Sequence, residues 1–361
     1  MPDESGDEGR SVDASGLWDR RRALTAGAVL GGTVWVAPTI LSVDAASAAT
    51  APPAPLARHA FVANSDVGSN SVSVVDTATD TVVATIPVGS SPQGVAVSPD
   101  GSRAYVTNWG GTTISAIDTA SNSVIATITV GNQPLGVAFT PDGTKVVVTI
   151  WGLNTVRIID TATNTLVGSA IPVGGFPTGI VVNPTGTRAY VTNANDDSVK
   201  VIDLSTNLVI STTFTGIGPK PQGIALDPTG TTAYVANTGY DFDPAFYGHE
   251  VSVLATASNT VTGSIVVGSG PFGVAVNPAG TRLYVTNSFD DTVSVVDTAS
   301  NTVIGSPISV GVTPQGIVVS PDGAFVYVTN FGAGSVSIIE TTGNSLDGTI
   351  VVGGGPYSVA I

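Results

Sequence analysis

Histidine and cysteine are nearly absent from this sequence, which restricts the chemistry that it can support. Its 361 residues include two histidines, His59 and His249, and no cysteine. A thiol nucleophile, a cysteine-ligated metal site and a metal centre built from several histidines are therefore excluded. His59 occupies a position that is basic in most of the repeats described below, so we interpret it as structural. His249 lies in a segment that has no counterpart elsewhere in the chain.

Aromatic and acidic residues gather in the segments that we expect to be loops on one face of the fold. Flat rings beside carboxylate acceptors suit stacking on sugars or contact with a partner chain. We therefore predict a ligand-binding surface formed by Tyr240, Asp241, Phe242, Asp243, Phe246, Tyr247, His249, Trp109, Trp151, Phe289, Asp290 and Phe331. Phe176, Phe272 and Tyr357 are expected on the same face.

The acidic pairs on this surface do not predict a metal site or a cofactor. Asp196 and Asp197, and likewise Asp290 and Asp291, lack the ordered spacing of a known calcium loop. Hydrolysis by paired carboxylates needs two acids at a defined separation, which the sequence alone does not give. No catalytic residue is therefore assigned.

Composition excludes several classes of protein. A net charge of −15 would repel a nucleic acid backbone, so we expect no nucleic acid partner. Hydrophobic residues make up 42% of the chain and charged residues only 11%, which excludes a disordered protein. Val, Thr, Gly, Ser and Asn dominate, as is typical of short strands joined by tight turns. These features predict an all-β protein.

An internal repeat decides the fold. The prolines of a P-x-G or P-x-S element recur at intervals of 42 to 50 residues, at Pro92, Pro134, Pro177, Pro221, Pro271, Pro314 and Pro356. Each unit holds four runs of strand length, for example 94–98, 104–108, 113–118 and 123–130, which is the content of one propeller blade. The longest interval contains an insertion, Thr238 to Glu250, where we expect the main ligand contacts.

The two termini complete the ring. The second strand of the unit occurs seven times, but its first copy, Ala60 to Asn64, has no inner strand before it. The chain ends with an inner strand, Tyr357 to Ile361, that has nothing after it. We therefore predict a seven-bladed β-propeller of four-stranded antiparallel blades, closed when the C-terminal strand pairs with the N-terminal blade.

Four copies of Tyr-Val-Thr-Asn, at 105–108, 190–193, 284–287 and 327–330, resemble the YVTN-repeat β-propeller family, as does Tyr-Val-Ala-Asn at 234–237. The likeness covers residues 58–361. It implies an exported or cell-surface protein and says little about activity, because propellers support unrelated functions.

The N-terminal region has the parts of a secretory signal. Arg20, Arg21 and Arg22 precede an apolar run, 23–43, and then small residues, 45–49. This arrangement resembles a twin-arginine signal. A membrane anchor is the alternative, although Pro38 within the run favours cleavage. We expect a signal peptide at 1–48, a Pro/Ala linker at 49–57 and the propeller at 58–361, in a mature chain that is secreted or at the cell surface, monomeric and without stable membrane insertion.

Two functions of different class follow from these features. The first is an exported, non-catalytic scaffold that binds a protein or a polysaccharide through its acidic, aromatic face. The alternative is an enzyme, a propeller lyase or lactonase, with its site at the mouth of the central channel. An enzyme of that kind would need a metal or a histidine base, and His249 is the only histidine in an expected loop.

The repeat also predicts a ladder of charge pairs on the opposite face. The residue before the second strand should neighbour the last residue of the third strand. The resulting pairs are His59 with Asp76, Arg103 with Asp118, Lys145 with Asp160, Arg188 with Asp203, and Arg282 with Asp297. Each aspartate could also cap its own turn.

Overall fold

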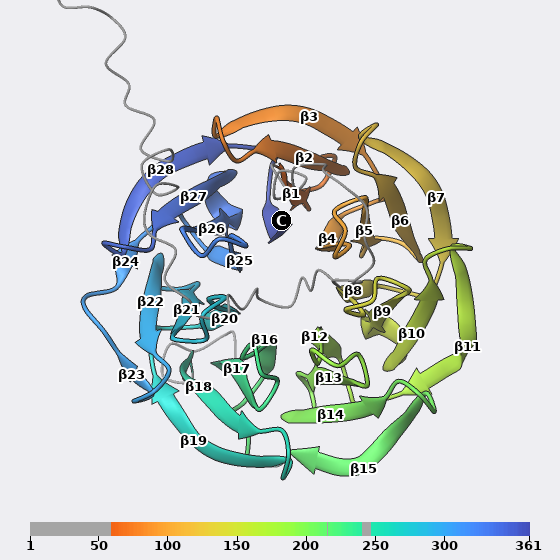
Figure 1. Ribbon diagram of the computed structural model, residues 1–361. Coiled ribbons are helices and arrows are strands. Elements are labelled where there is room, and N and C mark those ends of the chain that lie inside the picture. Colours follow the sequence, from red (N-terminus) through yellow and green to blue (C-terminus); the bar gives the residue numbers. More distant parts are fainter. Residues whose placement is uncertain (1–58, 215, 240–246) are drawn as a thin grey trace, which may run out of the picture. The chain divides into compact units, whose positions relative to one another are not determined.

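A computed structural model describes residues 59–214, 216–239 and 247–361, all of which fall within one compact unit. Seven antiparallel sheets are arranged in a ring around a central channel (Figure 1). The predicted signal peptide and linker lie outside the described residues.

The innermost strand of each blade faces the channel and starts with proline. Proline has no N–H to donate, so it is tolerated at the first residue of a strand on the inner edge of a sheet. These strands are β29 (Pro356–Ala360), β4 (Pro92–Val97), β8 (Pro134–Phe139), β12 (Pro177–Val182), β16 (Pro221–Leu226), β20 (Pro271–Val276) and β25 (Pro314–Val319).

The second and third strands form the buried middle of each blade. The second strands are β1 (His59–Asn64), β5 (Arg103–Asn108), β9 (Lys145–Ile150), β13 (Arg188–Asn193), β17 (Thr232–Gly239), β21 (Arg282–Asn287) and β26 (Phe325–Asn330). The third strands are β2 (Ser71–Asp76), β6 (Thr113–Asp118), β10 (Thr155–Asp160), β14 (Ser198–Asp203), β18 (Tyr247–Ala255), β22 (Thr292–Asp297) and β27 (Ser335–Glu340).

The outermost strand is exposed and is broken in one blade. Gly305 has a φ of 69° and is followed two residues later by Pro307, so the sixth blade has two short outer segments in place of one strand. The outer strands are β3 (Thr81–Pro87), β7 (Ser123–Thr129), β11 (Thr165–Pro172), β15 (Leu208–Phe214), β19 (Thr260–Val266), the pair β23 (Thr302–Val303) and β24 (Ile308–Ser309), and β28 (Ser345–Val351). Two short 3-10 helices follow second strands, η2 (Trp151–Leu153) and η4 (Phe331–Ala333).

The ring closes as predicted. Strand β29 pairs antiparallel with β1, with Val62 opposite Val359 and Phe61 opposite Ala360, so both ends of the chain share the first blade. The core lies between blades, because each apolar cluster joins two neighbours. One cluster, for example, joins Tyr105 and Ile114 of the second blade to Val146 and Val148 of the third.

The threonine of the YVTN element connects neighbouring blades. Thr192 Oγ1 accepts a hydrogen bond of 2.8 Å from the N–H of Gly179 in its own blade, and donates one of 2.7 Å to the carbonyl of Gln222 in the next blade. The pairing of the first two strands shifts register at this point, so the threonine hydroxyl takes the place of a strand partner for the Gly179 N–H. Thr107, Thr149, Thr286 and Thr329 make the same two bonds.

The predicted charge ladder is confirmed in its register, but the ion pairs that it implies at Arg103, Lys145 and Arg188 are not formed within 4 Å among the described residues. All five basic residues lie directly opposite their aspartates. Arg282 Nη1 lies 2.6 Å from Asp297 Oδ2, which is the one ion pair of the ladder within 4 Å among the described residues. Arg103 instead donates to the Thr161 carbonyl in the next blade. The aspartates mainly cap their own turns.

These turns should make the protein sensitive to acid. Hydrogen bonds from Ser121 hold the pKa of Asp118 below its usual value of 3.8, and bonds from the equivalent turns lower the pKa of Asp160, Asp203 and Asp297. A carboxylate whose pKa is lowered by folding stabilises the native state above its unfolded pKa, and this contribution is lost as the pH falls through the native value. We expect the urea midpoint to drop between pH 5 and about pH 3. Replacing all four aspartates with asparagine should flatten that decline.

Candidate functional site

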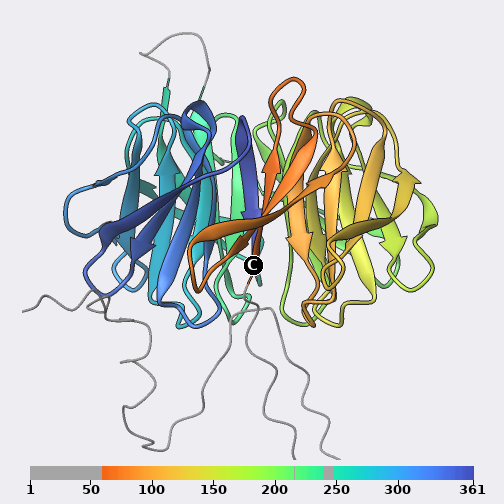
Figure 2. The same cartoon turned by 90° about the horizontal axis from the view of Figure 1, so that it is seen from above.

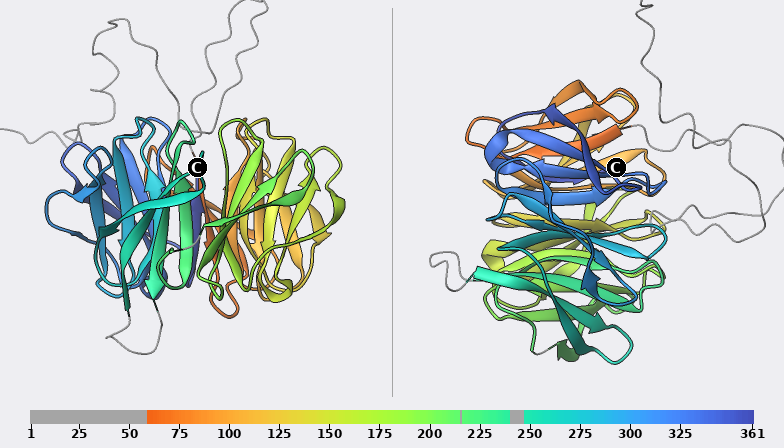
Figure 3. Two further views of the ribbon diagram at one scale, coloured as in Figure 1. Left: turned by 90° about the horizontal axis from the view of Figure 1, so that it is seen from below. Right: turned by 90° about the vertical axis from the view of Figure 1, so that its left-hand side faces the viewer.

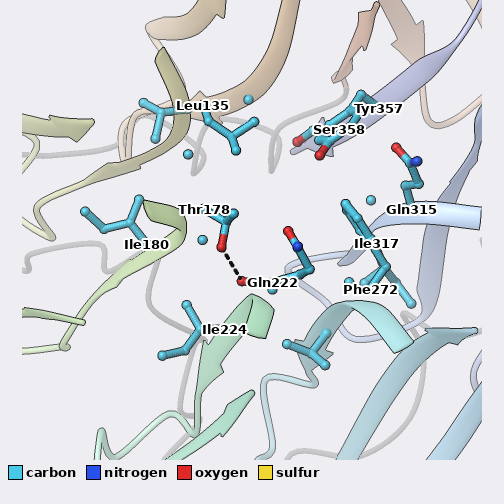
Figure 4. A pocket seen from close by; sticks show the side chains of 18 of the residues that line it. Leu135, Thr178, Ile180, Gln222, Ile224, Phe272, Gln315, Ile317, Tyr357 and Ser358 are labelled. Atoms are coloured by element: carbon cyan, nitrogen blue, oxygen red, sulfur yellow. Dashed lines mark hydrogen bonds between the residues drawn. The ribbon is translucent and has the colours of Figure 1, made fainter. Parts of the chain in front are cut away.

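The top face, where the innermost strands begin, carries a ring of side chains around the opening of the channel. The ring consists of the second residue of each innermost strand, so its composition is set by the variable x of the P-x-G element. Figure 4 shows part of this ring around the opening. Its members are Gln93, Leu135, Thr178, Gln222, Phe272, Gln315 and Tyr357.

Beneath this ring the channel is narrow and apolar. The third residue is glycine in six blades and Ser358 in the first, and the fourth is valine or isoleucine in every blade. A Cβ at Gly136 would lie 2.3 Å from the Thr178 carbonyl oxygen, so the blades approach too closely for a side chain there. The channel cavity, lined by these residues, has a volume of about 190 Å³.

A wider cavity opens above the ring, and we call it the mouth cavity. It has a volume of about 330 Å³ and shares Leu135, Thr178, Gln222, Phe272 and Tyr357 with the channel cavity, so the two cavities are adjacent. Its other lining residues are Gln93, Trp109, Trp151, Phe176, Ala194, Asn195 and Lys220. Among the described residues that line either cavity there is no histidine, aspartate or glutamate.

Three rings on consecutive blades form an aromatic wall on one side of the mouth cavity. Trp151 and Phe176 are stacked, with centroids 4.1 Å apart and an angle of 14° between their planes. Trp109 meets Trp151 edge to face at 6.5 Å. Phe176 remains 40% exposed. The structure therefore brings together Trp109 and Trp151, two of the predicted ligand contacts, and Phe176, which was expected on the same face.

Loop geometry fixes the direction of two lining residues. Phe176 and Lys220 each precede a proline and have positive φ values, 55° and 50°. Their N–H groups donate to Asn154 Oδ1 at 3.0 Å and to Asp197 Oδ1 at 2.8 Å. Because left-handed backbone is costly for residues other than glycine, these side-chain caps hold the loops that aim both side chains at the cavity.

A second group of rings lies on the opposite side of the channel. Phe272 and Tyr357 meet edge to face at 5.7 Å, and Phe331, a predicted ligand contact, meets Tyr357 at 6.5 Å. Burial raises the pKa of the Tyr357 phenol well above its usual range, so this hydroxyl stays protonated at physiological pH and can donate a hydrogen bond.

Three other predicted contacts gather around one loop outside these two cavities. His249 Nδ1 lies 3.4 Å from Ser269 Oγ, and the Ser269 N–H donates to Asp290 Oδ2 at 2.6 Å. Phe289 packs beside Gly270 and is 41% exposed. Neither cavity is lined by any of the three predicted residues.

The acids of the top face support loops. Asp196 Oδ2 accepts the N–H of Gly175 at 2.7 Å, and Asp291 Oδ1 accepts the N–H of Thr313 at 2.8 Å. These carboxylates replace missing backbone partners at turns. Within residues 59–214, 216–239 and 247–361, no group of three or more potential metal ligands is found. No helix among those residues is long and apolar enough to cross a membrane.

The predicted insertion is shorter than the sequence suggested. The backbone of Thr238 and Gly239 continues β17, and β18 already starts at Tyr247, opposite Gly239. Strands β17 and β18 are longer than the second and third strands of the other blades, and Figures 2 and 3 show them in the green-to-teal part of the ring. Tyr240, Asp241, Phe242, Asp243 and Phe246 lie outside the described residues.

Sequence reasoning missed the polar part of the site. Gln93, Gln222 and Gln315 belong to the ring at the channel, yet they were not singled out because glutamine alone signals no chemistry. The available signal was positional. Between a constant proline and an almost constant glycine, the x residue changes from glutamine to leucine, threonine, phenylalanine and tyrosine, which indicates freedom from packing constraints.

The fold defines the described domain as a seven-bladed β-propeller, and a match to a propeller family model agrees with the resemblance seen in the sequence. Residues 40–145 match the family model described as YNCE-like beta-propeller. No curated protein matches the chain significantly.

Solved structures similar to this chain include enzymes and a protein of unknown function. Kuenenia stuttgartiensis hydrazine synthase is 20% identical, with a TM-score of 0.68 over 75% of this chain and 89% of that chain. A functionally unknown protein from Desulfotomaculum acetoxidans DSM 771 is 18% identical, with a TM-score of 0.70 over 82% and 98%. Dihydro-heme d1 dehydrogenase NirN is 13% identical, with a TM-score of 0.61 over 86% and 77%. Such identities show a shared fold alone.

Proposed function

We propose that this protein is an exported, non-catalytic propeller that binds a macromolecular ligand, a protein or a polysaccharide, through its top face. The observation that carries the proposal is the aromatic wall of Trp109, Trp151 and Phe176 beside the mouth cavity. Partly exposed rings next to a concave surface are typical of binding sites. Export is supported by the arginines and the apolar run of the N-terminal region.

The lining of the cavities supports binding over catalysis. The described lining residues offer amides, hydroxyls, aliphatic groups and rings, with Lys220 as their one charged group. General acid–base catalysis needs a group that titrates near the working pH and lies beside the reacting atoms. A binding function needs only shape and hydrogen bonds, which this site has.

Removing one ring of the wall tests whether the ligand binds at the mouth cavity or elsewhere on the top face. We expect the full chain to co-sediment with cell envelopes of its source organism, and Trp151→Ala to weaken this retention at least tenfold, or about 1.4 kcal/mol. The reason is that Trp151 stacks on Phe176 and touches Trp109, so its loss disorders the whole wall.

Two variants complete the design. Phe289→Ala removes an exposed ring on the same face but outside the mouth cavity, and should bind like the native chain. Removing residues 240–246 tests the insertion. Retention lost in that variant and kept in Trp151→Ala would move the site to the insertion and contradict our placement.

A further inference from the structure

Resting on the proposed function, we infer that the mouth and channel cavities form one site for a neutral oligosaccharide, with a sugar ring on the aromatic wall and hydroxyl groups bound by glutamine amides in the channel. The inference selects one class of ligand from the two that the binding proposal allows. It also places the site at the channel axis and not at the insertion of the fifth blade.

The first step concerns the wall. A pyranose ring presents C–H groups on its faces and hydroxyls at its edge, so it needs a flat apolar surface with polar groups around it. Trp109, Trp151 and Phe176 supply such a surface along one side of the cavity, and Phe176 is 40% exposed. The amide of Asn195 belongs to the same lining.

The second step concerns the channel. Glutamine has one acceptor and two donors, which matches a hydroxyl that both donates and accepts. Gln222 and Gln315 lie with Tyr357 around the same opening (Figure 4), and the three come from different blades.

The third step concerns charge. A carboxylate-bearing ligand would approach a protein with a net charge of −15, whose top face carries Asp66, Asp196, Asp290 and Asp291. The cavities themselves contain no described carboxylate, and Lys220 stands at the mouth. The polar groups nearest the channel are uncharged amides and a phenol, which suit a neutral ligand because no buried charge needs a counterion.

The experiment titrates the full chain with neutral gluco-, manno- and N-acetylglucosamine oligosaccharides of one to six units, followed by calorimetry and tryptophan emission. Trp109 and Trp151 are two of the four tryptophans, so binding at the wall should change the emission. At least one series should bind, and affinity should increase from monosaccharide to trisaccharide as both wall and channel become occupied.

Matched substitutions locate the sugar. Gln222→Glu keeps the shape of the side chain but removes two donors, and should weaken binding at least tenfold. Gln133→Glu makes the same change on the top face outside both cavities and should have no effect. Lys220→Met removes the one charged group of the described lining and measures whether charge contributes to binding. Circular dichroism checks that each variant is folded.

Several results would overturn the inference. One is that no neutral series binds, and another is that Gln222→Glu and Gln133→Glu weaken binding equally. A third is that oligogalacturonate binds more tightly than neutral sugars and that Lys220→Met abolishes this binding of oligogalacturonate. If sugars fail while envelope retention still depends on Trp151 and disappears after protease treatment of the envelopes, the ligand is a protein, and only the sugar assignment falls.

Discussion

Deleting residues 357–361 should leave a protein that aggregates or loses several kcal/mol of its free energy of unfolding. These residues form most of β29, the inner strand of the first blade. Their loss removes Val359 and Ile361 from the cluster between the first and seventh blades, and exposes the ladder edge of β1. Burial of each aliphatic side chain is worth about 1.5–3 kcal/mol, and total stability is about 5–15 kcal/mol.

Urea unfolding and size-exclusion chromatography measure this effect. Thr329 would also lose the Tyr357 carbonyl, to which it donates at 3.0 Å, so the seventh blade is weakened as well. Val351→Ala on the exposed outer strand β28 removes aliphatic surface without opening the ring, and should shift stability by less than about 0.5 kcal/mol. An unchanged unfolding midpoint after the deletion would contradict closure by the two termini.

Gly136→Ala should destabilise the protein by about 3 kcal/mol, although it adds only one methyl group. The new Cβ would lie 2.3 Å from the Thr178 carbonyl oxygen and 3.1 Å from Thr149 Oγ1. The first of these is a backbone atom whose carbonyl accepts the interblade bond from Thr149, so it cannot move without separating two blades.

Gly263→Ala is the matched control for this prediction. Gly263 lies on the exposed outer strand β19, and no atom lies within 4 Å of the Cβ that it would gain. It should be neutral or slightly stabilising, since alanine restricts the unfolded chain more than glycine does. Equal denaturation midpoints for the two variants would show that the blades are not in close contact at the channel.

The sequence alone determined the architecture, because the repeat made every local signal appear several times. Proline before each inner strand, the Tyr-Val-Thr-Asn run and the Asp-rich turns recur with nearly constant spacing. The strand that starts at Ala60 lacks an inner neighbour in its own repeat, and the strand that starts at Tyr357 lacks an outer one, so the two had to pair and close the ring. The facing of Arg282 and Asp297 also followed from antiparallel pairing, since register is a local consequence of turn length.

The tertiary structure decided which side chains meet across blades. Trp109, Trp151 and Phe176 are 42 and 25 residues apart in sequence, and only the radial arrangement of the blades brings their rings together. The same arrangement separates Asp290 and His249 from the two cavities and gives Asp290 a backbone partner. Gln222 and Gln315 enter the site only because the second residues of all inner strands are arranged around one shared axis. A shared axis is a property of the closed ring that no single repeat contains.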